Sequence, residues 1–256
     1  MLYFISLGLH DEKDMSLKAL ETARACDLLF AEFYTTKLET TKEKLEQLIG
    51  KPIKLLSRKD LEENYQAILE EAKDKKVGLL VGGDAFVATT HVALRLEAIK
   101  QGIETRVIHG SSIISAIGET GLHVYKFGAS VTLPFLEKTK GKLPESVYEV
   151  IKLNKARGLH TLCLLDIVAE ANKLMKINEG IKILLDIEAR RKEGVISLED
   201  EIVIFARAGS EKPLLAFGKV KDILERNFED VPAVIIIPGL LHFTEKEFLE
   251  NFRISI

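Results

Sequence analysis

The sequence predicts an α/β protein with two domains. Its 256 residues exceed the ~100 to 150 residues that are typical of one domain. In the first hundred residues, short apolar runs alternate with segments of helical periodicity, as in a parallel sheet flanked by helices. In the second half strands are more frequent and turns are tighter, which favours a mixed sheet. We expect domains at residues 1–111 and 112–256, with Gly110 to Ser112 as the junction.

Five strands connected by helices are expected in the N-terminal domain. The expected strands are Leu2–Leu7, Leu28–Tyr34, Ile53–Leu56, Val77–Val81 and Glu104–His109. The expected helices are Ser16–Ala25, Thr41–Ile49 before Gly50, one helix with Leu61, Tyr65, Ile68, Leu69 and Ala72 on one face, and His91–Lys100. Ser57 and Asp60 resemble a capping box at the start of the third helix. Because crossovers of this length join parallel strands, we expect a five-stranded parallel sheet with flanking helices.

The C-terminal domain is predicted to hold fewer helices than the first domain and to have tighter turns. The expected strands are Thr161–Ile167, Ile202–Ala206 and Ala233–Pro238, and two further short segments are Val131–Phe135 and Leu214–Gly218. The expected helices are Ser146–Arg157 closed by Gly158, Asn178–Lys192 and Val220–Asn227. This order is typical of a mixed-sheet α/β domain.

Charge and hydropathy disfavour nucleic-acid and membrane partners. The formal net charge is only −3, so no global field would attract a polyanion. The local basic groups, Lys138, Lys140 and Lys142 and then Arg190, Arg191 and Lys192, are typical of solvated loops or helix ends. No apolar run approaches the ~20 residues of a membrane span.

Cysteine usage and the N-terminal residues favour a cytoplasmic protein. Cys26 and Cys163 both lie in apolar surroundings, where a buried free thiol is the usual state. The first ten residues lack a positive leader and reach His10 and Asp11 too early for a signal peptide.

The segment Val77 to His91, VGLLVGGDAFVATTH, predicts a ligand site. An apolar strand ends at Gly82 and Gly83, which can take backbone angles closed to other residues and let a ligand approach the main chain. Asp84 follows as a carboxylate able to accept a hydrogen bond from an amino or hydroxyl group. The alternative is a tight turn in which Asp84 only caps the next helix.

Several common ligand classes are disfavoured by missing motifs. Gly8 is followed by Leu9, His10 and Asp11, so the dinucleotide fingerprint is absent, and so is the phosphate-binding loop of nucleoside triphosphatases. The six histidines have no metal-ligand spacing, and we expect no metal. No nucleophile elbow is present. What is left is a parallel sheet whose strand ends carry glycines, one carboxylate and short polar turns.

Eight segments, in their order along the chain, resemble one family of methyltransferases. They are LGL at Leu7–Leu9, AEFYT at Ala31–Thr35, GGDAFVATTH at Gly82–His91, SIISAIGETGL at Ser112–Leu122, YKFG at Tyr125–Gly128, LLDI at Leu164–Ile167, ARAGS at Ala206–Ser210 and PGLLHF at Pro238–Phe243. The family is the diphthine synthase branch of the tetrapyrrole methylase-like, S-adenosylmethionine-dependent methyltransferases. The resemblance covers essentially the whole chain.

The resemblance implies a fold, a cofactor and a reaction. It implies two α/β domains with S-adenosylmethionine in the cleft between them, usually in a homodimer. The implied reaction is repeated methylation of the amino group of a 3-carboxy-3-aminopropyl histidine on elongation factor 2, an intermediate of diphthamide. The first loop, LGLHDEKDMS, departs from the proline- and glycine-rich loop of most tetrapyrrole methylases, which speaks for the diphthine branch. The fourth-strand loop has Gly-Gly-Asp-Ala-Phe where relatives often have Pro-Gly-Asp-Pro, so the turn is expected to be looser.

The resemblance also implies the residues that bind the methyl donor. These are Leu9, Asp84, Val87, Ser112, Ile113, Leu165, Ala208 and Ala233. Most of them follow predicted strands, where ligands bind in open parallel sheets. Core packing is the alternative for the apolar members. Candidates for the protein-substrate side are His10, Asp11, Tyr34, His91, Tyr125 and His242, for which structural hydrogen bonds are an equal explanation.

Two other functions remain open at this point. One is a methyltransferase of the same fold that acts on a corrin or porphyrin precursor. The other is a non-catalytic protein that binds a translation factor. The chemistry of the sulfonium donor requires mainly alignment of an uncharged amine, and no general base is assigned.

Overall fold

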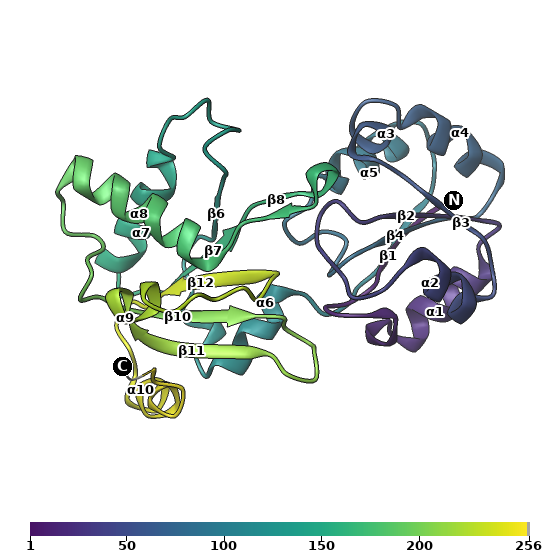
Figure 1. The fold of residues 1–256 in the computed structure, drawn as a ribbon. Coiled ribbons are helices and arrows are strands. Elements are labelled where there is room, and N and C mark those ends of the chain that lie inside the picture. The colour runs from purple at the N-terminus through teal and green to yellow at the C-terminus, as the bar shows by residue number, and fades with distance from the viewer. Residues whose placement is uncertain (255–256) are drawn as a thin grey trace. The chain divides into compact units, whose positions relative to one another are not determined.

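The computed structural model describes residues 1–254, and the chain divides into two compact units (Figure 1). The first unit holds residues 1–115 and 169–171, and the second holds residues 116–168 and the described residues from 172 onward. Among the described residues, no helix combines the length and the apolar character needed to cross a membrane.

The first unit is built on a five-stranded parallel sheet, as predicted. Its strands are β1 (Leu2–Ser6), β2 (Leu28–Glu32), β3 (Ile53–Leu55), β4 (Val77–Val81) and β5 (Thr105–Ile108). Their order is β3-β2-β4-β1-β5, and every neighbouring pair is parallel. The order places β1 and β4 at the centre, and both read as buried apolar runs because helices cover both faces.

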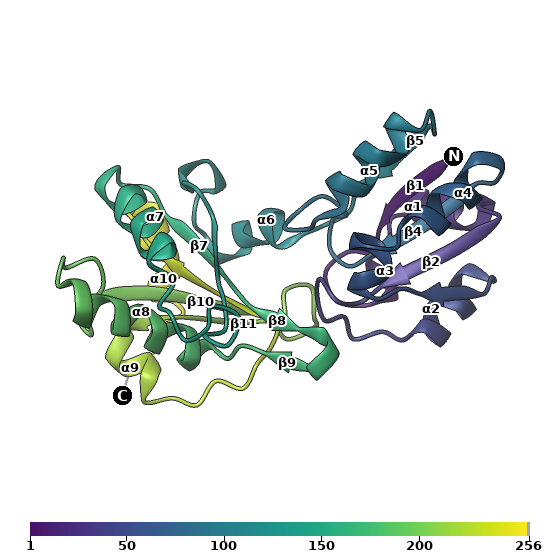
Figure 2. The ribbon, with the colours of Figure 1, turned by 90° about the horizontal axis from the view of Figure 1, so that it is seen from above.

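Helices cover this sheet on its two faces (Figures 1 and 2). The 3₁₀ turn η1 (Glu12–Asp14), α1 (Leu17–Ala25) and α2 (Lys42–Ile49) lie on one face, and α3 (Arg58–Glu62), α4 (Gln66–Asp74) and α5 (His91–Lys100) lie on the other. The cap residues explain the boundaries. Ser16 caps α1, Thr41 caps α2, and Gly50 ends α2 in the left-handed region.

The single helix expected around Leu61 to Ala72 is wrong, because the structure has two helices there. The capping box of Ser57 and Asp60 is present and begins α3. The backbone N–H groups of Glu63 and Asn64 both donate to the carbonyl of Lys59, at 2.9 and 3.0 Å. This paired closure ends a helix, so α4 begins anew after Tyr65.

The second unit is built on the predicted mixed sheet. Its strands are β6 (Val131–Leu133), β7 (Thr161–Leu165), β10 (Glu201–Ala206), β11 (Leu214–Lys219) and β12 (Ala233–Ile237). Their order is β11-β10-β12-β7-β6, and only the β6–β7 pair is parallel. Helix α6 (Ile113–Ala116) lies at the end of the first unit's long segment and leads into the second unit. The helical elements of the second unit are η2 (Ile117–Thr120), η3 (Val124–Lys126), α7 (Glu145–Ala156), α8 (Ile177–Arg191), α9 (Val220–Leu224) and α10 (Phe243–Glu250). Helices α7, α8 and α9 pack on one face of the sheet and bury the larger core cluster.

Several elements of this half of the chain were not predicted. The expected strand at residues 161–167 ends at Leu165, because the next carboxylate, Asp166, turns back and accepts hydrogen bonds from Phe135 N and Ile167 N, both at 2.9 Å. The chain then forms a short hairpin of β8 (Ile167–Val168) and β9 (Lys173–Leu174) around the 3₁₀ turn η4 (Ala169–Ala171). Helices α6 and α10 and the 3₁₀ turns η2 and η3 were also missed. Cys26 and Cys163 are buried and free, as predicted.

Candidate functional site

Three loops meet at the carboxyl end of the first sheet. They follow β1, β4 and β5, which are neighbours in the order β4-β1-β5. Gly8 N donates to the carbonyl of Gly83 at 3.2 Å, and Gly83 N donates to the carbonyl of Gly8 at 2.7 Å. This reciprocal pair joins the first two loops at the place where ligands bind in open α/β sheets.

The two glycines of the β4 loop serve different purposes. Gly83 has φ +69°, a left-handed conformation that a Cβ disfavours, and an added Cβ would meet nothing within 4 Å. A Cβ on Gly82 would lie only 2.4 Å from the Cγ2 of Thr36. Gly82 is therefore required by packing, whereas Gly83 sets the turn and borders open space.

Asp84 links the β4 loop to the β5 loop. Its Oδ2 accepts hydrogen bonds from His109 Nδ1 at 2.9 Å and from Gly110 N at 3.2 Å, and its Oδ1 accepts one from Phe86 N at 3.0 Å. Burial works to raise the pKa of Asp84, but these donors hold the pKa below its ordinary value, so the carboxyl is ionised at neutral pH. The Oδ1 atom keeps capacity to accept from a ligand.

The alternative in which Asp84 caps the following helix is wrong. Helix α5 begins at His91, and Thr90 stands at its N-cap position. Between them the chain forms a compact turn in which Val87 N donates to the carbonyl of Asp84 at 3.1 Å and Thr89 Oγ1 donates to that of Ala85 at 2.7 Å. Ala88 has φ +55°, which is uncommon for a residue with a side chain. The loop therefore stores some backbone strain to keep its shape.

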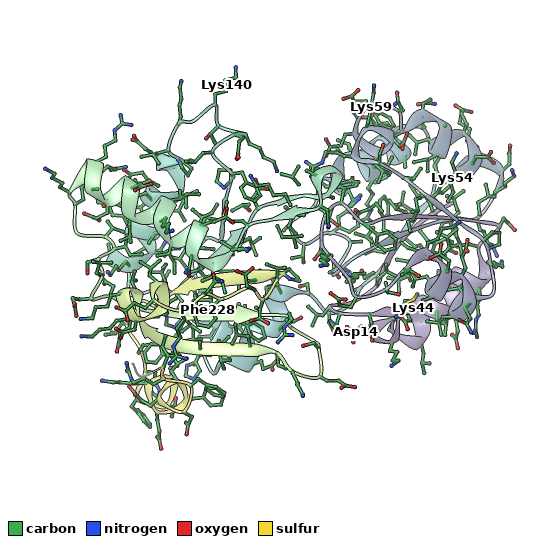
Figure 3. The ribbon with its side chains drawn as sticks, viewed as in Figure 1. Asp14, Lys44, Lys54, Lys59, Lys140 and Phe228 are labelled. Atoms are coloured by element: carbon green, nitrogen blue, oxygen red, sulfur yellow. The ribbon has the colours of Figure 1, made fainter. Side chains whose placement is uncertain are left out.

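The remaining predicted donor residues of the first unit lie on the same loops. Leu9 follows Gly8, and its N–H donates to Asp14 Oδ2 at 3.1 Å; Asp14 is labelled in Figure 3. Ser112 is buried, and its N–H donates to Ser115 Oγ at 3.1 Å as the chain enters α6 at Ile113. The structure thus gathers five of the predicted residues, Leu9, Asp84, Val87, Ser112 and Ile113, on three loops that are hydrogen-bonded together or continuous in sequence.

The three predicted residues of the second unit lie at one end of its sheet. Leu165 is the last residue of β7, and Ala233 is the first residue of β12. Ala233 is paired with Ala206 at the end of β10, two residues before Ala208. Because β12 is antiparallel to both β7 and β10, all three residues lie at the same end of the strands.

The candidates for the protein-substrate side are dispersed. His10 and Asp11 lie in the loop after β1, whereas Tyr34 and His91 are buried on the face of the first sheet that α3 to α5 cover. Tyr125 is 81% exposed in the second unit, where its hydroxyl lies 2.9 Å from His123 Nδ1. The ring of His123 also lies 5.5 Å from that of His242. In the described part of the chain, no cluster of three or more His, Cys, Asp or Glu side chains could hold a metal ion.

Sequence reasoning missed the residues that orient Asp84. His109 and Gly110 are 25 and 26 residues further along the chain, and they reach Asp84 only because β5 and β4 both pair with β1. Their position at the end of a predicted parallel strand could have indicated them, because the glycine turn lies at the same carboxyl end of the sheet.

Comparison with known proteins places the chain in a family. The model of the tetrapyrrole (corrin/porphyrin) methylases matches residues 1–224. The chain belongs to the tetrapyrrole methylase family. Within that family it is 50% identical over 253 residues to a diphthine synthase of Methanocaldococcus jannaschii, with 98% of each chain covered. It is 48% identical over 251 residues to a diphthine synthase of Methanococcus maripaludis, again with 98% of each covered.

A solved structure agrees with these sequence relatives. The crystal structure of a diphthine synthase has a TM-score of 0.89 with this tetrapyrrole methylase, at 38% identity, and covers 98% of this chain and 95% of that chain. The predicted α/β fold, with a parallel N-terminal sheet and a mixed C-terminal sheet, is confirmed.

Proposed function

We propose that this chain is an S-adenosylmethionine-dependent methyltransferase of diphthamide biosynthesis. It methylates the amino group of the 3-carboxy-3-aminopropyl histidine on elongation factor 2 and so yields diphthine. The observation that carries this proposal is the similarity to diphthine synthases over 98% of both chains. Similarity of this extent includes every loop at which a ligand site was predicted.

The donor site is proposed to draw on both units. In this proposal Leu9, Asp84 and Val87 belong to a domain of residues 1–111, and Ser112, Ile113, Leu165, Ala208 and Ala233 belong to a domain of residues 112–256. The residues fit such a ligand, because Gly83 borders open space and Asp84 Oδ1 accepts only one hydrogen bond.

Catalysis in this proposal depends on alignment. The sulfonium donor supplies a methyl group on a good leaving group, so the protein must hold the acceptor amine uncharged and in line with that methyl group. The chain's own contribution is a rigid frame. Asp84 is fixed by three donors, and the loop that carries Val87 is held by bonds within residues 84–90. Such preorganisation lowers the cost of ordering the site when the donor binds.

We further propose that the protein is a cytoplasmic homodimer whose macromolecular partner is elongation factor 2, with no nucleic acid and no membrane surface involved. The small net charge supports the absence of a polyanionic partner. The two buried free thiols suit a reducing compartment.

Calorimetric titration followed by a turnover assay tests the proposed function. We expect S-adenosylmethionine and its demethylated product to bind, and NAD and ATP to give no heat of binding. In the turnover assay, labelled methyl groups should appear on elongation factor 2 that carries the aminocarboxypropyl group, and none on a precorrin. Label on the precorrin would instead support the corrin alternative, and binding of the factor without any transfer would support a non-catalytic protein.

A further inference from the structure

A group of polar side chains lies beside the glycine turn, on the face of the first sheet that α3 to α5 cover. We define the Tyr34 cluster as Glu32, Tyr34, Arg58 and His91. Glu32 is the last residue of β2 and is paired in register with Val81, which directly precedes the Gly82–Gly83 turn. His91 is the first residue of α5 and directly follows the loop that carries Asp84 and Val87.

Glu32 is a fully buried carboxylate with unused acceptor capacity. Its Oε2 accepts hydrogen bonds from the N–H groups of Tyr34 at 2.9 Å and Thr35 at 3.1 Å. Its Oε1 accepts one from Thr35 Oγ1 at 2.5 Å and lies 3.8 Å from His91 Nε2, which is too far for a hydrogen bond. Burial raises the pKa of Glu32, while these donors and Arg58 oppose the rise.

Three polar atoms next to Glu32 are buried without a hydrogen bond of ordinary geometry, although the Thr90 hydroxyl lies near that of Tyr34 and the Ala85 backbone lies near the His91 ring. They are the hydroxyl of Tyr34 and both ring nitrogens of His91, on residues that are only 5% and 2% exposed. The two rings are neighbours, with centroids 6.5 Å apart. Burial lowers the pKa of His91 to about 4, against the opposing influence of the Ala85 backbone and Glu62, so the imidazole is neutral at neutral pH. Native proteins rarely leave such atoms unpaired, so three of them at one place call for a polar partner.

Arg58 places a cation beside this group. Arg58 begins α3, is exposed, and holds its guanidinium 5.0 Å from the centre of the Tyr34 ring. None of the ion pairs found among residues 1–254 includes Arg58. The other nearby charge, Glu62, accepts a hydrogen bond from Thr90 Oγ1 at 3.0 Å. The cluster therefore offers the guanidinium of Arg58 to an anion. It offers the remaining three side chains, as hydrogen-bond acceptors, to an amine.

We propose that the Tyr34 cluster is the receptor for the α-amino-acid end of the methyl acceptor. Arg58 takes the carboxylate of the aminocarboxypropyl arm, and the hydroxyl of Tyr34 and the ring of His91 take its amine. The arm enters where Arg58 covers the Tyr34 ring. This proposal rests on the proposed function, because that function supplies an acceptor with a carboxylate and an amine on one carbon.

The same α-amino-acid chemistry also occurs at the methionine end of the donor. The order of the strands in the sheet favours the methyl acceptor, and not the donor, as the ligand of the Tyr34 cluster. The predicted donor residues of the first unit follow β4, β1 and β5, whereas the cluster belongs to β2, α3 and the start of α5, on the other side of β4. The predicted donor residues and the Tyr34 cluster thus lie on opposite sides of the glycine turn. This arrangement would bring the donor and the acceptor together at the turn.

Two conservative variants with matched controls test the proposal. Tyr34→Phe removes only the unpaired hydroxyl, and Arg58→Gln removes the cation. The controls are Tyr65→Phe, which removes a hydroxyl next to the same core, and Lys59→Ala, which removes the adjacent exposed cation labelled in Figure 3. We expect each cluster variant to raise the KM for the modified elongation factor 2 about tenfold or more, as the loss of a bond to a charged or buried group does. The donor Kd should change less than about twofold, and the controls should match the wild type.

Three other outcomes would contradict either the acceptor assignment or the proposed function on which it rests. A weakened donor Kd with an unchanged KM would assign the cluster to the methionine end of the donor and overturn the acceptor assignment. Unchanged KM and Kd in both cluster variants, with normal wild-type turnover, would show that no ligand group pairs with these atoms. Absence of transfer by the wild-type protein would reject the proposed function itself, and the acceptor assignment with it.

Discussion

At the scale of single residues, Asp84 shows how far the sequence could specify the site. The glycine turn and the carboxylate after it predict a ligand loop, and the structure places them at the carboxyl end of a central strand. The sequence could not predict that Asp84 is held by His109 and Gly110, because these contacts depend on how β4, β1 and β5 pair. It also could not distinguish the packing role of Gly82 from the conformational role of Gly83.

His109 is expected to matter for donor affinity although its side chain is 75% exposed. A carboxylate only accepts, so His109 Nδ1 is the donor to Asp84 Oδ2 and fixes its orientation. We predict that His109→Ala weakens donor binding roughly tenfold, the usual effect of losing one such bond. Calorimetric titration measures it. The control is Arg106→Ala on β5, the strand that precedes His109, because the exposed pair of Arg106 with Glu104 should contribute little. Equal affinity of His109→Ala and the wild type would contradict the role.

Gly83→Val is expected to abolish donor binding and leave most of the fold intact. The new side chain would occupy the open space beside the turn, in a left-handed conformation that costs on the order of 1–3 kcal/mol for such a residue. Gly50→Val is a matched control, because Gly50 has φ +80° and its added Cβ also meets nothing within 4 Å, but it ends α2. Donor titration and circular dichroism of both variants separate strain from ligand exclusion. Normal binding by a folded Gly83→Val variant would reduce the motif to a turn.

At the scale of elements, cap residues made several helix boundaries predictable, whereas tertiary contacts made others unpredictable. Ser57 with Asp60 and Gly50 marked real helix ends. The break after α3 depends on the carbonyl of Lys59 accepting two bonds, and the end of β7 depends on the carboxylate of Asp166 turning back toward Phe135. Neither has a periodic signal in the sequence.

The start of α10 was missed for a similar reason, since it depends on a buried network around Glu245. This carboxylate is fully buried and accepts hydrogen bonds from His123 N at 2.8 Å, His242 N at 2.7 Å and His160 Nε2 at 3.1 Å, and it also pairs with Lys126. Burial works to raise the pKa of Glu245, but Lys126 and these donors lower it to about 2. The network connects the helix to the η3 segment and to the start of β7.

Glu245 is expected to make stability depend on acid pH. Its folded-state pKa of about 2 lies below the ordinary value of 4.5, so its contribution is fully present above pH 4.5 and is lost as the pH falls toward 2. The shift corresponds to roughly 3 kcal/mol. We predict that Glu245→Gln lowers the free energy of unfolding at pH 7 by about that order and that the difference from the wild type shrinks between pH 5 and 2. Denaturant unfolding over this pH range checks it, with the exposed Glu247→Gln as control. A constant difference over the range would contradict the ionised role.

At the scale of the whole molecule, alternation of strands and helices was enough to predict the architecture. Crossovers long enough to hold helices required parallel pairing in the first sheet, and the closely spaced strands of the second half indicated a mixed one. The strand order in each sheet was not predictable, because periodicity shows which face of a strand is buried and not which strand lies next to it. The β8–β9 hairpin, with two residues in each strand, is too short to produce a pattern.

The proposed methyl acceptor is the amine of the added arm, and a comparison of modified with unmodified elongation factor 2 tests this assignment. Elongation factor 2 with the 3-carboxy-3-aminopropyl group on its histidine, and the same factor without it, are each incubated with the protein and methyl-labelled S-adenosylmethionine. An unmodified histidine offers only imidazole nitrogens that cannot reach the position of that amine, and a misplacement of even ~1 Å can cost about a hundredfold in rate. We predict label on the modified factor and none on the unmodified one. Equal labelling of both would show that another residue is methylated and would contradict the assignment of the acceptor.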